Sequence, residues 1–310
     1  MSEQHFAQVG YENYYQMLSD NIRMEAYRKA IFKCVKPGDV VVDLGAGTGL
    51  LTIWAIKAGA KKVYAIEKTD AIHLAAEIAK ANGCLDKVEF IQKNSLDVTL
   101  PQKADVIVSE TLGSFGIDEN ALIFTNDARK RFLKENGIMI PENISLFNAP
   151  VEDAKCYHKL DFWRHIPDID FTPAFNLFSS KIMIESVNPH GLLALPVCIG
   201  EINFKDDTEP TFVSRVYIQM NKGGTIHGMA GWFNVTLCDG IEISTAPTAP
   251  QTHWKQAFMP LKETINVIEK DVFDWTVCIH ATETGSDHAK ISYEYRCTQL
   301  QNELNDITKK

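Results

Sequence analysis

The stretch that decides the fold is Val40-Val41-Val42-Asp43-Leu44-Gly45-Ala46-Gly47-Thr48-Gly49. An apolar, β-branched run leads into a glycine-rich turn, and the apolar residues 50–60 that follow are typical of a helix. A buried strand, a glycine loop and a helix make the opening βα unit of a nucleotide-binding sheet. The glycine spacing is G-x-G-x-G, with Leu50 where a dinucleotide-binding loop has its third glycine. We therefore expect an α/β, Rossmann-like domain.

Acidic residues around this loop indicate which cofactor it binds. A second strand, residues 62–67, ends in Glu67, which is placed to accept hydrogen bonds from both hydroxyl groups of a ribose. That acid is compatible with NAD and with S-adenosylmethionine. Asp43 favours S-adenosylmethionine, because a sulfonium cofactor with an ammonium group tolerates a nearby carboxylate better than a pyrophosphate does. A helix over 70–82 and a strand over 87–91 continue the α/β alternation.

A pair of glutamates follows the next predicted strand, residues 104–109. Glu110 comes directly after this buried run, where open α/β sheets bind their ligands, and Glu119 lies nine residues later. Gly113 and Gly116 let the loop fold back, so the two carboxylates could face each other. Such carboxylates repel in a partly desolvated pocket, and a planar guanidinium relieves the repulsion better than an ammonium does. The alternative is that Glu110 caps a helix or pairs with a surface lysine.

The rest of the chain divides into three predicted parts. Residues 1–35 form a helical segment, because apolar side chains recur at a helical period over 11–35. Residues 36–143 form the Rossmann-like domain, with its last helix over 120–135. From 144 to 310, β-rich runs separated by Pro, Gly and Asp predict an all-β domain, built as a sandwich or a barrel. Its expected strands are residues 181–187, 197–204, 212–220, 226–237, 264–269, 273–281 and 289–296.

An aromatic, irregular segment over residues 157–178 interrupts the β-rich part. So many aromatic side chains without strand alternation suggest a projecting arm that docks on another surface. If that surface belongs to a second copy of the chain, the assembly should be a closed dimer. The alternative is a loop that packs on its own domain.

Composition limits the possible partners and location. The formal net charge of −9 argues against a nucleic-acid backbone as partner and favours a cationic substrate, although acidic proteins are also common for solubility alone. The seven cysteines are scattered and lack a C-x-x-C pair, so we expect reduced thiols, no disulfide framework and no metal site. No window approaches a membrane span, and the start of the chain lacks the features of a signal peptide, which predicts a cytoplasmic protein.

Taken together, the motifs resemble the protein arginine methyltransferase family over nearly the whole chain. The segments that carry the resemblance occur in the family's order: the helix that closes over the cofactor at 17–23, the first cofactor motif at 42–49, the paired glutamates Glu110 and Glu119, the dimerisation arm at 157–178, a barrel strand at 226–234 and the Thr-His-Trp loop at 252–256. The resemblance implies an S-adenosylmethionine-dependent N-methyltransferase of arginine guanidinium groups, with a β-barrel substrate domain and a homodimeric assembly.

The resemblance also implies roles for individual residues. The implied catalytic residues are Glu110 and Glu119, which would clamp the guanidinium, and His253, which would pair with Asp20 across the two domains. The implied cofactor-binding residues are Arg23 at the carboxylate, Glu67 at the ribose, and Asp43, Gly45, Gly47, Gly49, Lys68, Ser95, Leu96 and Glu110. The implied substrate-binding residues are Met17, beside the methyl acceptor, with Glu110, Glu119, His253 and Trp254.

Three features leave the activity open. Leu112-Gly113-Ser114-Phe115 resembles the symmetric-dimethylating branch of the family, whereas Thr252-His253-Trp254 resembles the asymmetric and monomethylating branches. Tyr11, Tyr14 and Tyr15 are similar to the family's aromatic segment over the cofactor and substrate, but lie closer to Met17 than in the family. The substrate could be a protein or peptide arginine, or free arginine or another small guanidine. A non-catalytic assembly partner is a further alternative.

Overall fold

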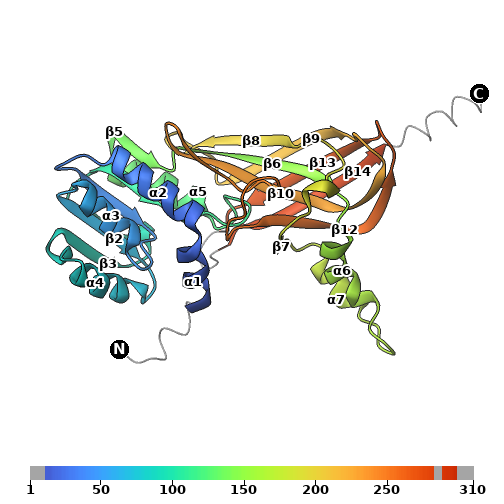
Figure 1. The fold of residues 1–310 in the computed structure, drawn as a ribbon, viewed down its shortest axis with the longest axis horizontal. Coiled ribbons are helices and arrows are strands. Elements are labelled where there is room, and N and C mark those ends of the chain that lie inside the picture. The colour runs from blue at the N-terminus through green and yellow to red at the C-terminus, as the bar shows by residue number, and fades with distance from the viewer. Residues whose placement is uncertain (1–10, 283–287, 299–310) are drawn as a thin grey trace, which may run out of the picture.

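The structure, a computed structural model, describes residues 11–282 and 288–298. Its N-terminal part contains a five-stranded parallel sheet with the strand order β3-β2-β1-β4-β5 (Figure 1). The direction of strand succession reverses between β1 and β4, and ligands of open α/β sheets bind at such a switch point. The strands are β1 (Val40–Leu44), β2 (Lys62–Glu67), β3 (Val88–Gln92), β4 (Ala104–Ser109) and β5 (Leu133–Ile140).

Helices connect these strands as the sequence predicts, with one correction. The predicted strands over 62–67 and 87–91 and the helix over 70–82 are confirmed to within one residue. The prediction of a helix to residue 135 is wrong, because Leu133 already begins β5, whose Ile138 pairs with Val106 of β4. The helices are α3 (Leu50–Ala58), α4 (Ala71–Ala81) and α5 (Ala121–Phe132), with short 3-10 turns η2 (Leu85–Lys87) and η3 (Ser95–Asp97).

The helical segment before the sheet is split in two. The sequence predicts one helix over 11–35, but the structure has α1 (Tyr11–Ser19) and α2 (Asn21–Cys34). Asp20 separates them because it caps α2: its backbone is non-helical, and its Oδ1 accepts the Arg23 backbone N–H at 3.1 Å. The break places α1 at the junction between the parallel sheet and the β-rich part of the molecule (Figure 1).

The β-rich part consists of two antiparallel sheets. Six strands form one sheet in the order β7-β12-β10-β6-β8, with β11 paired to β10, and three form the other in the order β14-β13-β9. This confirms an antiparallel, β-rich second part of the fold. Its strands are β6 (Asn143–Val151), β7 (Met183–Glu185), β8 (Val197–Asn203), β9 (Thr211–Gln219), β10 (Gly224–Cys238), β11 (Ile241–Ser244), β12 (Gln256–Val267), β13 (Val272–His280) and β14 (Lys290–Thr298).

One strand prediction in this part is wrong. Residues 264–269 are only the end of a strand that begins at Gln256, because the buried run from Gln256 to Leu261 also belongs to β12. Pro260 obscured this run, since proline is rare within sheets. The structure accommodates Pro260 opposite Gly228, where the register of β10 shifts.

The aromatic segment folds as a helical hairpin rather than an irregular stretch. It comprises α6 (Ala154–Asp161), η4 (Phe162–Arg164) and α7 (Thr172–Phe178), and it projects from the β-rich part (Figure 1). Phe175 is buried against the β-rich part, in the same cluster as Trp232 and Phe258. Ile169 and Leu177 remain 63% and 58% exposed. The segment is therefore anchored to its own domain and still presents apolar side chains outward.

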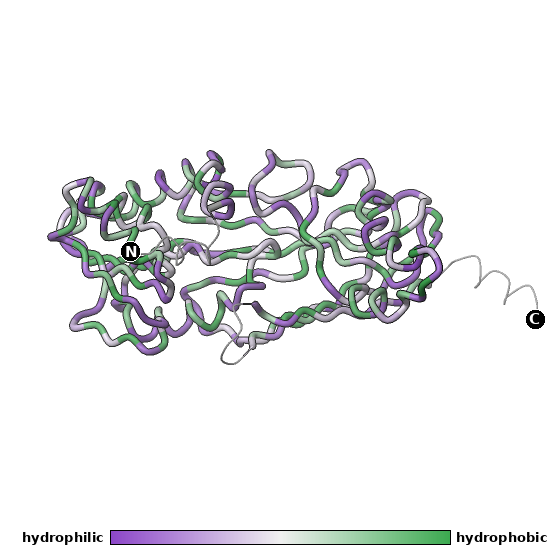
Figure 2. The backbone as a smooth tube through the Cα atoms, turned by 90° about the horizontal axis from the view of Figure 1, so that it is seen from below, coloured by the Kyte–Doolittle hydropathy of each residue, from purple (hydrophilic) through white to green (hydrophobic). Residues whose placement is uncertain are grey.

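A continuous core runs through both parts of the molecule. One cluster of buried residues includes Ile31 of α2, Val106 of the parallel sheet, and Leu146 and Trp275 of the two antiparallel sheets. Figure 2 shows hydrophobic residues mainly along the interior strands and hydrophilic residues mainly at the peripheral loops. Within the described residues, no helix combines the length and apolar character needed to cross a membrane.

Candidate functional site

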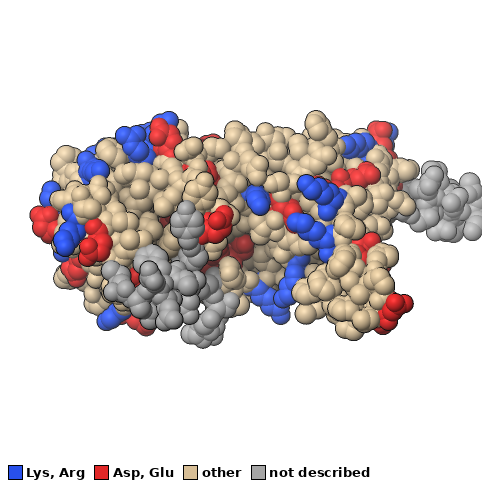
Figure 3. Space-filling view, turned by 60° about the horizontal axis from the view of Figure 1, so that its bottom comes forward, with Lys and Arg blue, Asp and Glu red and all other residues tan. Residues whose placement is uncertain are grey.

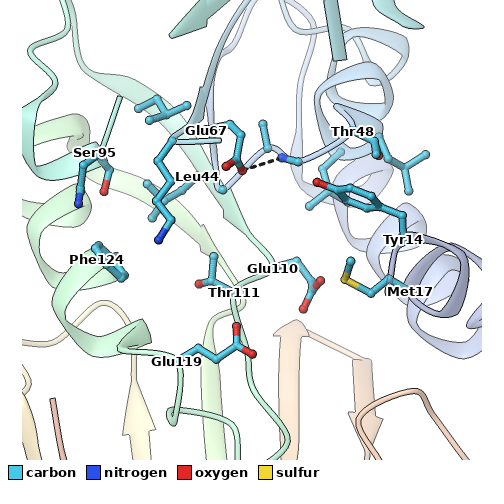
Figure 4. Close-up of a pocket in the computed structure, with 18 of the residues that line it drawn as sticks. Tyr14, Met17, Leu44, Thr48, Glu67, Ser95, Glu110, Thr111, Glu119 and Phe124 are labelled. Atoms are coloured by element: carbon cyan, nitrogen blue, oxygen red, sulfur yellow. Dashed lines mark hydrogen bonds between the residues drawn. The ribbon is translucent and has the colours of Figure 1, made fainter. Parts of the chain in front are cut away.

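A cavity of about 320 Å³ opens at the carboxyl ends of β1, β2 and β4, the switch point of the parallel sheet. Helix α1 and the start of α2 contribute to its wall through Tyr14, Met17 and Arg23. Figure 4 shows Glu67, Glu110 and Glu119 arranged around this cavity. The predicted site residues that line it are Met17, Arg23, Gly45, Gly47, Glu67, Lys68, Ser95, Glu110 and Glu119.

The glycine loop lines the cavity with Gly45, Ala46, Gly47 and Thr48. The backbone N–H groups of Gly45 and Ala46 both donate to the Ile66 carbonyl, at 2.9 and 3.0 Å. Gly45 has a φ of +75°, and a Cβ there would lie 2.8 Å from the Thr111 side chain. Only glycine therefore fits between the loop and the segment that carries Glu110.

Asp43 is a buried residue of β1, just before the glycine loop. Its carboxylate is fully buried, and its Oδ2 accepts a hydrogen bond from the Thr52 hydroxyl at 2.6 Å. Burial raises the pKa of the Asp43 carboxyl to about 7, although the hydrogen bond from Thr52 opposes this shift. Asp43 therefore packs against α3 through Thr52 and is not among the described residues that line the cavity.

Glu67 is oriented toward the cavity by backbone donors. Its Oε2 accepts the Gly47 N–H at 3.1 Å and its Oε1 accepts the Thr69 N–H at 2.8 Å. The ring of Tyr14 lies over the same loop, 3.7 Å from where a Cβ at Gly47 would stand. Burial, and to a smaller extent the negative charge of Glu67, raises the pKa of the Tyr14 hydroxyl to about 12. The Tyr14 hydroxyl is therefore uncharged. The Glu67 carboxylate beside it can still accept hydrogen bonds from the two hydroxyl groups of a ribose.

Glu110 and Glu119 approach the cavity from the two ends of one loop (Figure 4). Glu110 forms an ion pair with Nη2 of Arg23, and both side chains are at most 10% exposed. Glu110 thus neither caps a helix nor pairs with a surface lysine. The second guanidinium nitrogen of Arg23, Nη1, donates to the Met17 carbonyl at 2.8 Å. This contact ties helix α1 to the edge of the parallel sheet.

The loop between the two glutamates is a tight, internally bonded turn. Gly113 and Gly116 exchange backbone hydrogen bonds of 3.2 and 2.9 Å. Asp118 accepts the Phe115 N–H at 3.0 Å, and it lies so near that a Cβ at Gly113 would stand 2.3 Å from its Oδ1. The indole N–H of Trp254 donates to the Leu112 carbonyl at 2.7 Å. The β-rich part therefore holds this loop in place.

His253 and Asp20 form the contact across the two parts that the resemblance implies. The backbone N–H and Nδ1 of His253 both lie 2.9 Å from Asp20 Oδ2. Burial alone would raise the pKa of Asp20, but the hydrogen bonds from His253 and Arg23 outweigh it, so the pKa lies below its usual range. A charged Asp20 thereby links the α1–α2 junction to the loop before β12.

Several predicted residues lie outside the cavity lining formed by the described part of the chain. Asp20 and His253 pair with each other, Trp254 is buried beside Leu112, and Leu96 is 41% exposed. Gly49 faces Ala75 instead, where a Cβ would stand 2.9 Å from the alanine methyl group. The direct roles of these residues, with that of Asp43, stay predictions.

The cavity also contains residues that the sequence did not assign to the site. Lys93 and Asn94 follow β3 and Thr111 follows Glu110, so their position after parallel strands was a usable signal. Phe124 reaches the cavity from the first turn of α5. No sequence pattern distinguishes it from a core residue of an amphipathic helix.

Comparisons with known protein families match both parts of the chain. The family model described as "Arginine methyltransferase oligomerization subdomain" matches residues 142–300. The model for ribosomal protein L11 methyltransferase matches residues 25–143. The first match covers the β-rich part with the arm, and the second covers the parallel sheet with the cavity.

Similar proteins span nearly the whole chain. It is 31% identical to protein arginine N-methyltransferase 6 of Danio rerio, over 90% of this chain and 85% of that protein. It is 29% identical to protein arginine N-methyltransferase 1 of Saccharomyces cerevisiae, over 95% of this chain and 89% of that protein.

Solved structures share the fold. The Trypanosoma brucei PRMT1 enzyme–prozyme complex with AdoHcy has a TM-score of 0.85 at 23% identity, covering 94% of this chain and 95% of that one. Arabidopsis thaliana protein arginine methyltransferase 10 has a TM-score of 0.76 at 26% identity, covering 92% and 98% of the two chains. Both contain the same combination of a Rossmann-like part and an antiparallel β-rich part.

Proposed function

This chain belongs to the protein arginine methyltransferase family, and on that premise we propose that Glu110 and Glu119 hold an arginine guanidinium beside S-adenosylmethionine in the cavity. The chain is an S-adenosylmethionine-dependent arginine N-methyltransferase. The relatives reported above are named for methylation of protein arginine, which favours a protein or peptide substrate over free arginine. The observation that carries the clamp is the presence of both glutamates around one cavity with the glycine loop (Figure 4).

The residues around the cavity fit the cofactor. Arg23 is buried, and its Nε has no hydrogen-bond partner within the described residues, so its guanidinium can hold the cofactor carboxylate. Glu67 can accept from the ribose hydroxyls, and Gly45 and Gly47 allow a close approach of the ligand to the backbone. When bound, S-adenosylmethionine supplies an electrophilic methyl group on a positively charged sulfur.

The two glutamates orient and activate the acceptor. The guanidinium nitrogens are poor nucleophiles because their lone pairs are delocalised. Two carboxylates that accept bidentate hydrogen bonds would concentrate positive charge on the nitrogens they contact and leave the target nitrogen richer in electrons. Methyl transfer is an in-line displacement, so alignment at near-attack distance is the main task of the protein.

A carboxylate of the clamp is well placed to take the proton that the acceptor nitrogen loses. Glu110 and Glu119 both line the cavity, whereas His253 is not among its described lining residues and its Nδ1 contacts Asp20. We therefore assign the proton acceptor to the glutamate pair and a supporting role to His253 and Asp20. Met17, on the cavity wall, would limit the space beside the methyl acceptor.

Product analysis tests this proposal and separates it from its alternatives. The protein is incubated with isotope-labelled cofactor, free arginine and a pool of arginine-rich peptides, and the products are identified by mass spectrometry. Methylated peptides support the proposal. Methylated free arginine alone would establish a small-molecule enzyme, and cofactor binding without any transfer would establish a non-catalytic partner.

The arm is proposed as the contact of a homodimer. The family model that matches residues 142–300, which include the arm, is described as an oligomerization subdomain. The arm also carries exposed apolar side chains. On the face shown in Figure 3, the arm presents mostly uncharged atoms, with acidic atoms at its tip. A closed dimer would cover this surface. The division into segments 1–35, 36–143 and 144–310 and the cytoplasmic location stay predictions.

A further inference from the structure

The two residues that flank Glu119 are both bonded to the connection between β13 and β14. Asn120, on one side, pairs with Thr282, which follows β13. On the other side, the Asp118 carbonyl accepts the backbone N–H of Ala289, just before β14, at 2.7 Å. The β-rich part thus holds the chain immediately before and after the predicted clamp residue.

The contact between Asn120 and Thr282 is the more specific of the two, because it involves side chains. Its Nδ2 donates to the Thr282 hydroxyl at 3.2 Å, and its Oδ1 accepts the Thr282 backbone N–H at 3.0 Å. The Thr282 hydroxyl in turn donates to the His288 carbonyl at 2.9 Å. Asn120 is 2% exposed, so both ends of its amide are used in a desolvated place.

The backbone of Asn120 adds a constraint on Glu119. Its φ of 57° lies in the left-handed region, which asparagine tolerates better than most residues. The chain makes this sharp turn at the residue before α5 begins. Side-chain bonds to Thr282 stabilise the turn, and the turn sets the direction in which Glu119 leaves the loop.

We propose that Asn120 and Thr282 are positioning residues that fix the Glu119 carboxylate for guanidinium binding. This inference rests on the proposed function of the glutamate pair. Neither residue lines the cavity formed by the described residues, so both act through Glu119 rather than on the substrate. Displacement of a catalytic group by about 1 Å can reduce a rate by about 100-fold, so loss of the tie should reduce methyl transfer while the cofactor still binds.

A second asparagine–threonine pair, between Asn126 of α5 and Thr208, provides a matched control. Asn126 of α5 donates through Nδ2 to the Thr208 hydroxyl at 2.8 Å, which is also a contact between the two parts of the molecule. This pair lies one to two turns farther along α5 than Asn120. Thr208→Val and Thr282→Val therefore remove the same kind of contact at different distances from Glu119.

The experiment measures kcat and KM for an arginine-rich peptide, with the Kd of S-adenosylhomocysteine as the readout for a general structural effect. We expect Thr282→Val to reduce kcat/KM by about 10-fold or more, with the Kd changed by less than about twofold. Asn120→Gly, which keeps the left-handed turn but removes the amide, should have a larger effect. Thr282→Ser, which retains the hydroxyl, and Thr208→Val should stay near wild type.

Specific outcomes overturn the inference. It is wrong if the wild type is active and Thr282→Val has the same kcat/KM. It is also wrong if Thr208→Val lowers kcat/KM as much as Thr282→Val does. It is also wrong if Asn120→Gly lowers kcat/KM by the same factor in the wild-type and Glu119→Gln backgrounds, because the effect would then not pass through Glu119. A wild-type protein that transfers no methyl group to any guanidine overturns the proposed function itself.

Discussion

Substitution of Glu119 tests guanidinium binding without removing the ion pair between Glu110 and Arg23. Glu119→Gln keeps the size of the side chain and removes its charge. Charge-assisted hydrogen bonds contribute about 1.5–3 kcal/mol, so we expect kcat/KM for an arginine peptide to fall by about 10- to 150-fold. Steady-state kinetics measure this loss, and titration with S-adenosylhomocysteine should show a cofactor affinity close to wild type.

The control for this substitution is Glu135→Gln, at an exposed glutamate of β5. It removes the same charge from the same part of the molecule and should leave kcat/KM unchanged. Equal activity of Glu119→Gln and wild type would contradict the role of Glu119 in the clamp.

Asp43 makes stability depend on pH. Its pKa is about 7 in the folded protein and about 4 in an unfolded chain, so the folded state holds a proton that the unfolded state has lost between these values. The stabilisation is fully present below about pH 4 and is lost as the pH rises to about 7. Relative to Asp43→Asn, the wild-type free energy of unfolding should therefore fall by a few kcal/mol over this range, at about 1.4 kcal/mol per pKa unit.

Urea unfolding of both proteins at several pH values measures this difference. The amide introduced by Asp43→Asn can still accept the Thr52 hydroxyl, so the comparison isolates the ionisation. Parallel stability curves for the two proteins from pH 4 to pH 7 would exclude a raised pKa at Asp43.

The sequence was sufficient to predict the location of site residues whose position depends on a single strand. Glu67 is the last residue of β2 and Glu110 comes directly after β4, so both had to lie at the carboxyl edge of the parallel sheet. The pairing of Glu110 with Arg23 depends on where α1 and α2 break, which is a tertiary property. The same holds for Trp254, whose bond to Leu112 joins segments far apart in the chain.

At the scale of elements, the arm formed by α6, η4 and α7 should control assembly. Deletion of the whole arm would uncover the β-rich core, because Tyr157 and Phe175 are buried there. Substitution at its exposed surface is more specific. Ile169→Asp with Leu177→Asp should convert the proposed dimer to a monomer, because burial of each apolar side chain contributes about 1.5–3 kcal/mol and burial of a charge opposes association.

Light scattering coupled to size-exclusion chromatography measures the mass of each variant. Leu195→Asp is the control, since this leucine is 71% exposed but precedes β8, outside the arm. It should leave the mass at that of wild type. A dimer that survives both arm substitutions at the same protein concentration would rule out this surface as the contact.

Elements with a regular pattern could be predicted from the sequence, and those defined by their partners could not. Helix α4 and strand β2 have a clear period and clear ends, and their predicted bounds are nearly correct. Strand β12 includes Pro260, which is acceptable only because β10 shifts register opposite it. The two sheets of the β-rich part likewise depend on pairings that no local pattern encodes.

At the scale of the whole molecule, the continuous core predicts one cooperative unfolding transition. Buried residues of α2, the parallel sheet and both antiparallel sheets belong to one cluster. The two parts should therefore unfold together, with equal calorimetric and van't Hoff enthalpies. S-adenosylhomocysteine at about 100 times its Kd should stabilise the whole molecule by about 2.7 kcal/mol.

Differential scanning calorimetry with and without this ligand measures both effects. Two separable transitions, of which only one shifts with the ligand, would show that the parallel sheet and the β-rich part are independent units.

The most direct test of the central claim is the identity of the methylated atom. Wild-type protein and the Glu119→Gln variant are incubated with labelled S-adenosylmethionine and two peptides that differ only by lysine in place of arginine, and fragment mass spectra locate the label. The glutamate clamp predicts label on the guanidinium nitrogens of the arginine peptide with wild type, a strong reduction with the variant, and none on the lysine peptide. Equal labelling by both proteins, or label on lysine, would contradict it.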